Sequence, residues 1–187
     1  MNRRPEIVDG QVETARQCPS PNQDRRPADC QPSLLVIHGI SLPPGEFGGP
    51  WIEQLFTNCL DANHHPFFKE IQHLRVSSHL LIRRDGCLVQ YVPLHRRAWH
   101  AGRSAFMGRR ACNDFAIGIE LEGCDDQAYT DAQYAALSPV VAAIRAEYPA
   151  IEPHRVVGHC HIAPGRKTDP GPMFQWHRLR QGMLDWQ

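Results

Sequence analysis

The apolar run LLVIH (residues 34–38) is the stretch on which the prediction of the fold rests. A short continuous run of Leu, Val and Ile is typical of a β-strand that is covered on both faces. The run ends at His38, and strand ends are where loops assemble functional sites on a rigid base. The sequence therefore predicts a buried strand that presents His38 to such a site.

A second stretch, VVGHCHIAPGRKTDPGP (residues 156–172), carries residues that complement His38. Residues 155–159 are a further strand candidate that ends at His159, and the loop after it, rich in proline and glycine, carries Asp169. Structural zinc sites usually close all four positions with Cys and His, whereas two imidazoles and a carboxylate leave one position free for water. We therefore predict that His38, His159 and Asp169 hold a catalytic zinc ion that serves a hydrolysis.

Each of these residues also fits an ordinary role when it is taken alone. The chain has 11 histidines, and any one of them is also compatible with a surface or hydrogen-bonded position. Asp169 precedes Pro170, which restricts it to extended or turn geometry, so a simple turn residue is the alternative. Cys160 is a possible ligand or nucleophile, but adjacent residues of an extended chain point to opposite faces, and we expect no direct role for it.

The segment FAIGIELEG (residues 115–123) predicts the strand that carries the acid–base group. Bound zinc lowers the pKa of water toward about 7, so Glu120 could accept the proton of that water as a general base. Lys167, two residues before Asp169, could face the developing oxyanion. The alternatives are a paired carboxylate for Glu120 and a solvated charge for Lys167. The strand alternates, with Phe115, Ile117 and Ile119 on one face and Ala116, Gly118 and Glu120 on the other.

Other basic and aromatic residues are candidates for contacts with a substrate. Trp99 lies in RAWHAG (residues 97–102) and could stack on a sugar, although burial in the core fits it as well. Arg75, Arg109 and Arg110 could bind carboxylates of a substrate in bidentate fashion, and exposure without a partner is the alternative for each.

The remaining periodicities indicate helices and one hairpin. VSSHLLIRRDGCLVQYV (residues 76–92) has two strand-like runs around Asp85-Gly86, which is a strong hairpin signal. A capping-box pattern begins at Thr130, and Pro139 interrupts the helix that follows. Because strands and helices alternate irregularly, we predict a mixed α+β (α/β) fold with a central mixed β-sheet flanked by helices. Helical spacing covers residues 51–59, 130–148 and 173–184.

Length and composition predict a single domain over residues 1–187, with residues 1–33 as a largely irregular arm. Basic and acidic residues number 20 each, so nothing in the composition suggests a polyanion-binding surface and we expect no nucleic-acid partner. No stretch reads as a signal peptide or a membrane span, which predicts a cytoplasmic protein that binds no membrane. We also expect a monomer. The 7 cysteines form no C-x-x-C pair, and we expect reduced thiols.

Six strings follow one another in the order found in a single family: LLVIHGISLPPGEFGGPWI, SSHLLIRRDGCLVQYVP, RAWHAG, CNDFAIGIELEG, YTDAQYAAL and VVGHCHIAPGRKTDPGP. Over roughly residues 14–180 the chain resembles the N-acetylmuramoyl-L-alanine amidases of the amidase-2 and peptidoglycan-recognition-protein-like group. The resemblance implies the fold of that group and a zinc hydrolase. The implied substrate is 1,6-anhydro-N-acetylmuramyl-peptide, cut between the lactyl group and L-alanine in cytoplasmic cell-wall recycling, with an influence on β-lactamase induction.

The same resemblance assigns roles residue by residue: zinc ligands for His38, His159 and Asp169, activation of water for Glu120, support of the oxyanion for Lys167, and substrate contacts for Trp99 and Arg75.

The chain departs from the family pattern at three positions. Gly39 stands where asparagine is usual, Phe67 where tyrosine is common, and Ala111 where arginine is expected. These changes concern substrate binding, and Arg110 is a candidate replacement for the missing charge. Two rival hypotheses keep the same residues: a lytic amidase that attacks intact peptidoglycan, and a recognition module that binds without cutting.

Overall fold

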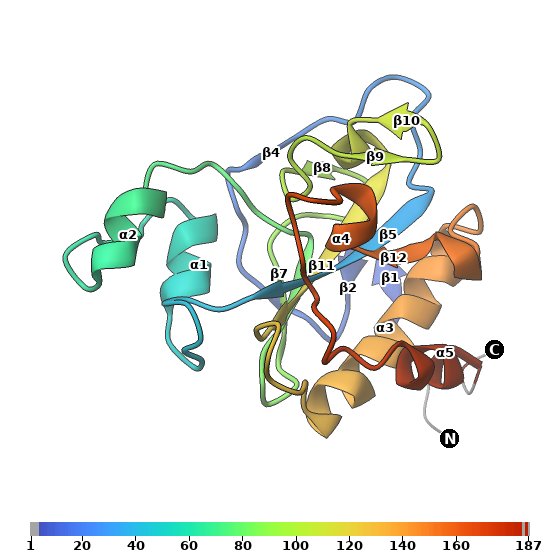
Figure 1. The fold of residues 1–187 in the computed structure, drawn as a ribbon. Coiled ribbons are helices and arrows are strands. Elements are labelled where there is room, and N and C mark those ends of the chain that lie inside the picture. The colour runs from blue at the N-terminus through green and yellow to red at the C-terminus, as the bar shows by residue number, and fades with distance from the viewer. Residues whose placement is uncertain (1–3, 185, 187) are drawn as a thin grey trace.

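The computed structural model describes residues 4–184 and residue 186 (Figure 1). Residues 1–3 of the predicted arm, and residues 185 and 187 of the predicted domain, lie outside this part. A six-stranded sheet forms the centre, in the order β12 (Val156–Gly158), β5 (Leu34–Ile40), β11 (Ala116–Glu122), β6 (Leu80–Ile82), β7 (Leu88–Gln90) and β3 (Arg16–Gln17). The pairs β12–β5, β5–β11, β11–β6 and β7–β3 are parallel and β6–β7 is antiparallel, which confirms the mixed α+β fold.

One face of the sheet is covered by two helices that pack on each other, α3 (Asp131–Glu147) and α5 (Trp176–Leu184) (Figure 1). Alternate residues of the central strands, such as Leu35 and Ile117, share one apolar cluster with Leu137 of α3. This face holds the largest part of the core.

The opposite face is divided between two smaller clusters. Toward β6 and β7, Leu81 packs with α1 (Trp51–Phe56) and with Phe68 of α2 (Pro66–Ile71). Toward the start of β5, Leu34 packs with Ile162 of α4 (His159–Ile162). Coverage on both faces explains why β5 reads as a continuous apolar run.

The predicted hairpin is confirmed, since β6 and β7 pair with Ile82 opposite Leu88. Its turn is longer than a two-residue turn: the N–H of Arg83 donates to the carbonyl of Cys87, and Gly86 has φ 86°. A positive φ of this kind favours glycine, which explains the Asp-Gly signal.

The capping box of α3 is also confirmed, because Thr130 accepts from the N–H of Gln133 and the Gln133 side chain accepts from the N–H of Thr130. Pro139 lies inside this helix, which continues through it. α1 and α5 are shorter than predicted, because α1 ends at Phe56 and α5 begins at Trp176.

Two local predictions need correction. The strand expected over residues 155–159 stops at Gly158, and His159 begins α4, so His159 is a helical residue rather than the last residue of a strand. Phe115 does not share a face with Ile117: it ends the 3-10 helix at Cys112–Asp114 and packs in the cluster around Leu34.

The N-terminal arm contains more regular structure than the sequence predicts. Besides β3 it forms β1 (Ile7–Val8), β2 (Gln11–Val12) and β4 (Gln23–Asp24), and β4 pairs with β8 (Arg97–Ala98). Arg26 ties the arm to the sheet, because its guanidinium donates to the carbonyls of four residues, Leu94, Asn113, Asp114 and Ala116. A second hairpin, β9 (Ala105–Phe106) with β10 (Arg109–Arg110), lies above the sheet (Figure 1).

The cysteines of the described chain are all free thiols. None of the described helices is long and apolar enough to cross a membrane.

Candidate functional site

Three neighbouring parallel strands bring the central residues to one level of the sheet. In the β5–β11 ladder His38 pairs with Glu120, and side chains of such paired residues lie on the same face. In the β12–β5 ladder Gly158 pairs with Ile37, so His159 follows at the level of His38. The three side chains come together at the carboxyl ends of the strands, where open parallel sheets form their crevices.

The nitrogen and oxygen atoms of the predicted metal ligands face one another. Nδ1 of His38 is 3.0 Å from Nδ1 of His159, and Oδ2 of Asp169 is 3.1 Å from His159 Nδ1 and 3.4 Å from His38 Nδ1. Tetrahedral zinc with bonds of about 2.0–2.1 Å separates its ligand atoms by about 3.3 Å. The observed distances are close to this spacing, so the three residues form a group that could hold a metal ion.

Each ligand is oriented by a second contact. Nε2 of His159 lies 3.4 Å from the carbonyl oxygen of Ala101, and the N–H of Gly39 donates to Oδ2 of Asp169 at 3.4 Å. Nε2 of His38 lies 2.9 Å from Nδ1 of His100. The N–H of Cys160 donates to the carbonyl oxygen of Asp169, so the loop that carries the carboxylate is tied to the start of α4.

The protonation states of the ligands favour cation binding. Burial lowers the pKa of His38 to about 4, which keeps its imidazole neutral near pH 7. Burial alone would raise the pKa of Asp169, but hydrogen bonds with His159 and His38 outweigh it and hold that pKa below its ordinary value. Neutral imidazole and ionised carboxylate are the forms that bind metals.

Glu120 has the environment of an acid–base group. Its Oε1 is 3.9 Å from His38 Nδ1, and its Oε2 is buried without a hydrogen-bond partner in the described chain. Burial, with the charge of Asp169 adding to it, raises the pKa of Glu120 well above its ordinary value. A buried carboxylate oxygen with no partner is a costly arrangement that is common at functional sites.

A cleft of about 200 Å³ contains this group, and it gathers two of the other predicted residues. Lys167, which is exposed, and Trp99, which is half-buried, line it together with Glu120, His159 and Asp169. Apolar walls come from Phe56, Leu74 and Val76.

The arginines predicted to contact the substrate lie elsewhere. Arg75 is exposed, and its guanidinium donates to the carbonyls of Gln72 and Leu74. Arg109 stacks on the ring of Phe115, 4.0 Å from its centre.

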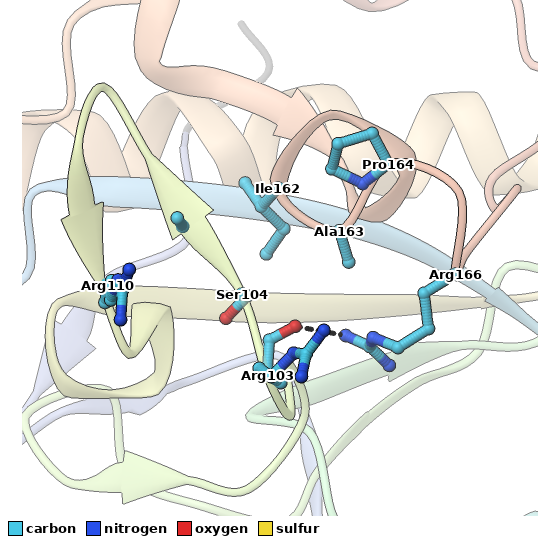
Figure 2. A pocket seen from close by; sticks show the side chains of 8 residues that line it. Arg103, Ser104, Arg110, Ile162, Ala163, Pro164 and Arg166 are labelled. Atoms are coloured by element: carbon cyan, nitrogen blue, oxygen red, sulfur yellow. Dashed lines mark hydrogen bonds between the residues drawn. The ribbon is translucent and has the colours of Figure 1, made fainter.

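Arg110 lines a different pocket, of about 500 Å³, which we call the arginine groove because Arg103, Arg110 and Arg166 contribute to it (Figure 2). Figure 2 shows Arg166 held by the carbonyl of Arg103, a hydrogen bond of 2.9 Å, while Arg110 projects from the hairpin on the other side.

The three departures from the family pattern fall at different distances from the cleft. Gly39 lines it, and a Cβ at this position would lie 2.4 Å from the hydroxyl of Tyr129. Phe67 packs beside α1, and Ala111 is an exposed residue with φ 59° at the end of the β9–β10 hairpin.

Cys160 lies in the helix α4 and not in an extended chain, so the prediction that it points away from the His159 side on the opposite face of a strand is wrong. Its thiol is absent from the group of possible metal ligands in the described chain.

Sequence reasoning missed His100, the partner of His38. Its ring fills the space left by Gly118, where a Cβ would lie 2.6 Å from the imidazole. The sequence signal was the small residue Gly118, two positions before Glu120, which indicates free space beside the strand. It does not identify the side chain that fills this space.

Comparisons with known proteins agree with one another. A family model described as N-acetylmuramoyl-L-alanine amidase matches residues 28–172. The 1,6-anhydro-N-acetylmuramyl-L-alanine amidase AmpD of Salmonella typhimurium (strain SL1344) is 63% identical over 171 residues, which cover 91% of this chain and 91% of that protein. AmpD of Haemophilus influenzae is 51% identical over 178 residues, 95% of this chain and 97% of that protein.

Solved structures are similar as well. A crystal structure of a Se-Met AmpD derivative superposes with a TM-score of 0.92 at 61% identity, covering 94% of this chain and 98% of that one. AmiD from E. coli, in complex with the substrate anhydro-N-acetylmuramic acid-L-Ala-D-gamma-Glu-L-Lys, gives a TM-score of 0.62 at 32% identity, covering 84% of this chain and 60% of that one.

Proposed function

The chain belongs to the N-acetylmuramoyl-L-alanine amidase family, and on this premise we propose that it hydrolyses the amide between the lactyl group of 1,6-anhydro-N-acetylmuramic acid and L-alanine in muropeptides. The observation that carries the proposal is the buried, unpartnered Oε2 of Glu120 beside three preorganised metal ligands. A module that only binds peptidoglycan has no need of a carboxylate kept in this state.

His38, His159 and Asp169 are the residues that would hold zinc, since their donor atoms are spaced for a tetrahedral ion. When bound there, zinc would supply Lewis acidity, which would polarise the scissile carbonyl and lower the pKa of the attacking water. Two imidazoles and one carboxylate are a donor set of catalytic rather than structural zinc sites.

Glu120 accepts the proton of the attacking water at its unpartnered Oε2. The same oxygen then passes the proton to the amine of L-alanine as the C–N bond breaks, so Glu120 acts first as a base and then as an acid. Lys167, on the rim of the cleft, faces the carbonyl oxygen as negative charge develops there. No covalent enzyme intermediate is needed.

Trp99 offers an aromatic surface to the sugar inside the same cleft. We place the peptide of the substrate across the neighbouring arginine groove, where Arg110 and Arg103 are free to bind carboxylates. Arg75, at the outer edge of the cleft beside the lining residue Leu74, then also contacts the substrate.

The biological setting is the one that the family resemblance implies. We propose that the protein acts as a cytoplasmic monomer in cell-wall recycling, and that its loss raises the muropeptides that influence β-lactamase induction.

The test combines metal analysis with mass-spectrometric detection of the peptide released from anhydro-muropeptide. Wild-type protein is expected to carry about one zinc per chain and to release peptide. Glu120→Gln removes the base but keeps the shape, and it is expected to lose about 10² to 10⁴ in rate while zinc content stays unchanged.

Val141 belongs to α3 and packs in the core cluster between this helix and the sheet. Val141→Ala is the matched control and should leave turnover unchanged. Peptide release by zinc-stripped protein, or by Glu120→Gln at the wild-type rate, would contradict the mechanism. Purified sacculi form a second arm: a preference for sacculi over soluble anhydro-muropeptide would indicate a lytic amidase.

A further inference from the structure

His38 has two ring nitrogens that face different groups. Nδ1 points at His159 and Asp169, whereas Nε2 lies 2.9 Å from Nδ1 of His100. A neutral imidazole carries one proton, so a lone pair on Nδ1 for a metal requires that the proton sit on Nε2. This proton can then be donated only to His100.

His100 is positioned for that contact by its surroundings. Its ring meets the ring of His38 edge-on, at 89° with 5.0 Å between centres, and lies where Gly118 has no side chain. The backbone N–H groups of His100 and Ala101 both donate to Oδ1 of Asn113, which fixes the turn that carries the ring. Its Nε2 is buried and has no hydrogen-bond partner in the described part of the chain.

We propose that His100 is a positioning residue that accepts the Nε2–H of His38 and thereby holds His38 in the tautomer and orientation of an Nδ1 metal ligand. The proposal rests on the metal site proposed above. His100 touches neither metal nor substrate through this contact, so it acts through His38.

The two histidine ligands are oriented in different ways. The partner of His159 Nε2 is the carbonyl oxygen of Ala101, which can only accept and therefore fixes one tautomer. The partner of His38 is an imidazole, which can accept or donate depending on where its own proton lies. If His100 carried its proton on Nδ1, His38 would be the acceptor, its own proton would sit on Nδ1, and the ligand atom would be blocked.

The unpartnered Nε2 of His100 follows from the same arrangement. With Nδ1 of His100 accepting, the proton of the neutral ring must lie on Nε2, inside the protein and without an acceptor. Packing alone would favour an apolar ring at this position, since no buried polar atom would then lack a partner. The retained imidazole indicates that the acceptor at Nδ1 is what the site uses.

The experiment compares His100→Asn with His100→Leu. The amide oxygen of asparagine falls near the position of Nδ1 and can only accept, whereas leucine fills space and offers no acceptor. Zinc affinity is measured by competition with a chromophoric chelator, and the Co²⁺-substituted protein gives a visible spectrum that reports on ligand geometry.

His100→Leu is expected to weaken zinc binding by about 10- to 100-fold and to change the Co²⁺ spectrum. His100→Asn is expected to restore most of the affinity and the wild-type spectrum. Zinc bound by His100→Leu as tightly as by wild type would overturn the proposal, and so would His100→Asn as weak as His100→Leu, since bulk rather than the acceptor would then matter.

Gly118→Ala tests the same contact without removing the ring, because its Cβ would displace His100. It is expected to weaken zinc binding as well, and unchanged affinity would overturn the proposal even if His100→Leu failed to fold. Val141→Ala controls for lost stability and should keep wild-type zinc affinity. Failure of the proposed function is distinguishable, because wild-type protein would then release no peptide from anhydro-muropeptide, whatever the zinc affinities of the variants.

Discussion

His79 is a buried histidine that lies one step behind the site. Its ring packs against His100, 5.6 Å between centres, but its own nitrogens are engaged elsewhere. Nδ1 accepts from the N–H of Gly118, and Nε2 donates to the carbonyl of Arg96. Burial, with a smaller contribution from Arg26, lowers the pKa of His79 to about 3.

This pKa predicts how stability depends on pH. In the unfolded chain the pKa is about 6.5, so as pH falls below that value the unfolded state takes up a proton that the folded state excludes. The stability that His79 contributes is therefore complete above about pH 6.5 and is lost as pH falls toward 3, with a slope of up to about 1.4 kcal/mol per pH unit.

His79→Gln keeps a donor for Arg96 and removes the ionisation, so the slope of unfolding free energy against pH between 4.5 and 6 should flatten by up to about that amount. Urea unfolding of the metal-free protein measures it. His73→Gln, at an exposed position, is the control. Equal slopes for wild type and His79→Gln would refute the prediction.

At the scale of elements, α3 continues through a proline. Pro139 has no N–H, so the carbonyl of Ala135 lacks its helical donor. Both residues line an open groove beside Leu88 at the β6–β7 hairpin, where water can reach that carbonyl. The structure thus reduces the cost of an interior proline without removing it.

Pro139→Ala should raise the free energy of unfolding by about 1 to 3 kcal/mol, because it restores a donor and a good helix former. Denaturant unfolding at neutral pH measures the free energy of unfolding. Ala135→Gly is the control: it should lower that free energy by about 1 kcal/mol, which would show that this part of α3 reports on helix stability. A less stable Pro139→Ala variant would mean that the local backbone requires the ring.

Elements with strong local signals could be predicted from the sequence, and elements that depend on distant partners could not. The Asp-Gly turn and the Thr130 capping box act within a few residues, and both were located correctly. The end of β12 was not located correctly, because pairing with β5 stops at Gly158 and nothing near His159 in the sequence marks that point. The four short strands of the arm were missed because each has only two residues and pairs with a segment chosen by the fold.

At the scale of the molecule, a chain with no net charge still gathers positive charge beside its cleft. Residues 99–105 separate two hollows: Trp99 and His100 line the cleft, and Arg103 lines the arginine groove. Arg166 reaches across to the carbonyl of Ala101, to which Nε2 of His159 also points. A substrate bound across both hollows would lie against the candidate metal ligands at one end and against guanidinium groups at the other.

Replacing Arg110 with Ala should therefore raise the KM for anhydro-muropeptides that carry free peptide carboxylates by about 10-fold and leave kcat unchanged, because it removes ground-state and transition-state binding equally. Steady-state kinetics on a substrate with amidated carboxylates supplies the matched arm, where the variant and wild type should agree. Arg145→Ala, on α3, is the control variant. An equal rise of KM on both substrates would show that the arginine groove does not bind the peptide carboxylates.

The grouping of the candidate ligands could be predicted from residue type, from strand ends and from the family resemblance, and the structure brings their donor atoms within 3.4 Å of one another. That they hold zinc stays a prediction. The supporting contacts could not be predicted, since His38 and His100 lie 62 positions apart and only the folded chain joins them.

The register of β12, β5 and β11 has a consequence for how such a protein can vary. His38, Glu120 and His159 keep their spacing through backbone pairing, so insertions or deletions in the loops at residues 41–50, 57–65, 123–129 or 148–152 would leave it intact. A deletion of one residue inside β5 or β11 would turn every later side chain of that strand to the opposite face. Substrate range is thus free to drift with the loops while the chemistry stays fixed, and lineages of this fold should differ in loop length long before they differ in these strands.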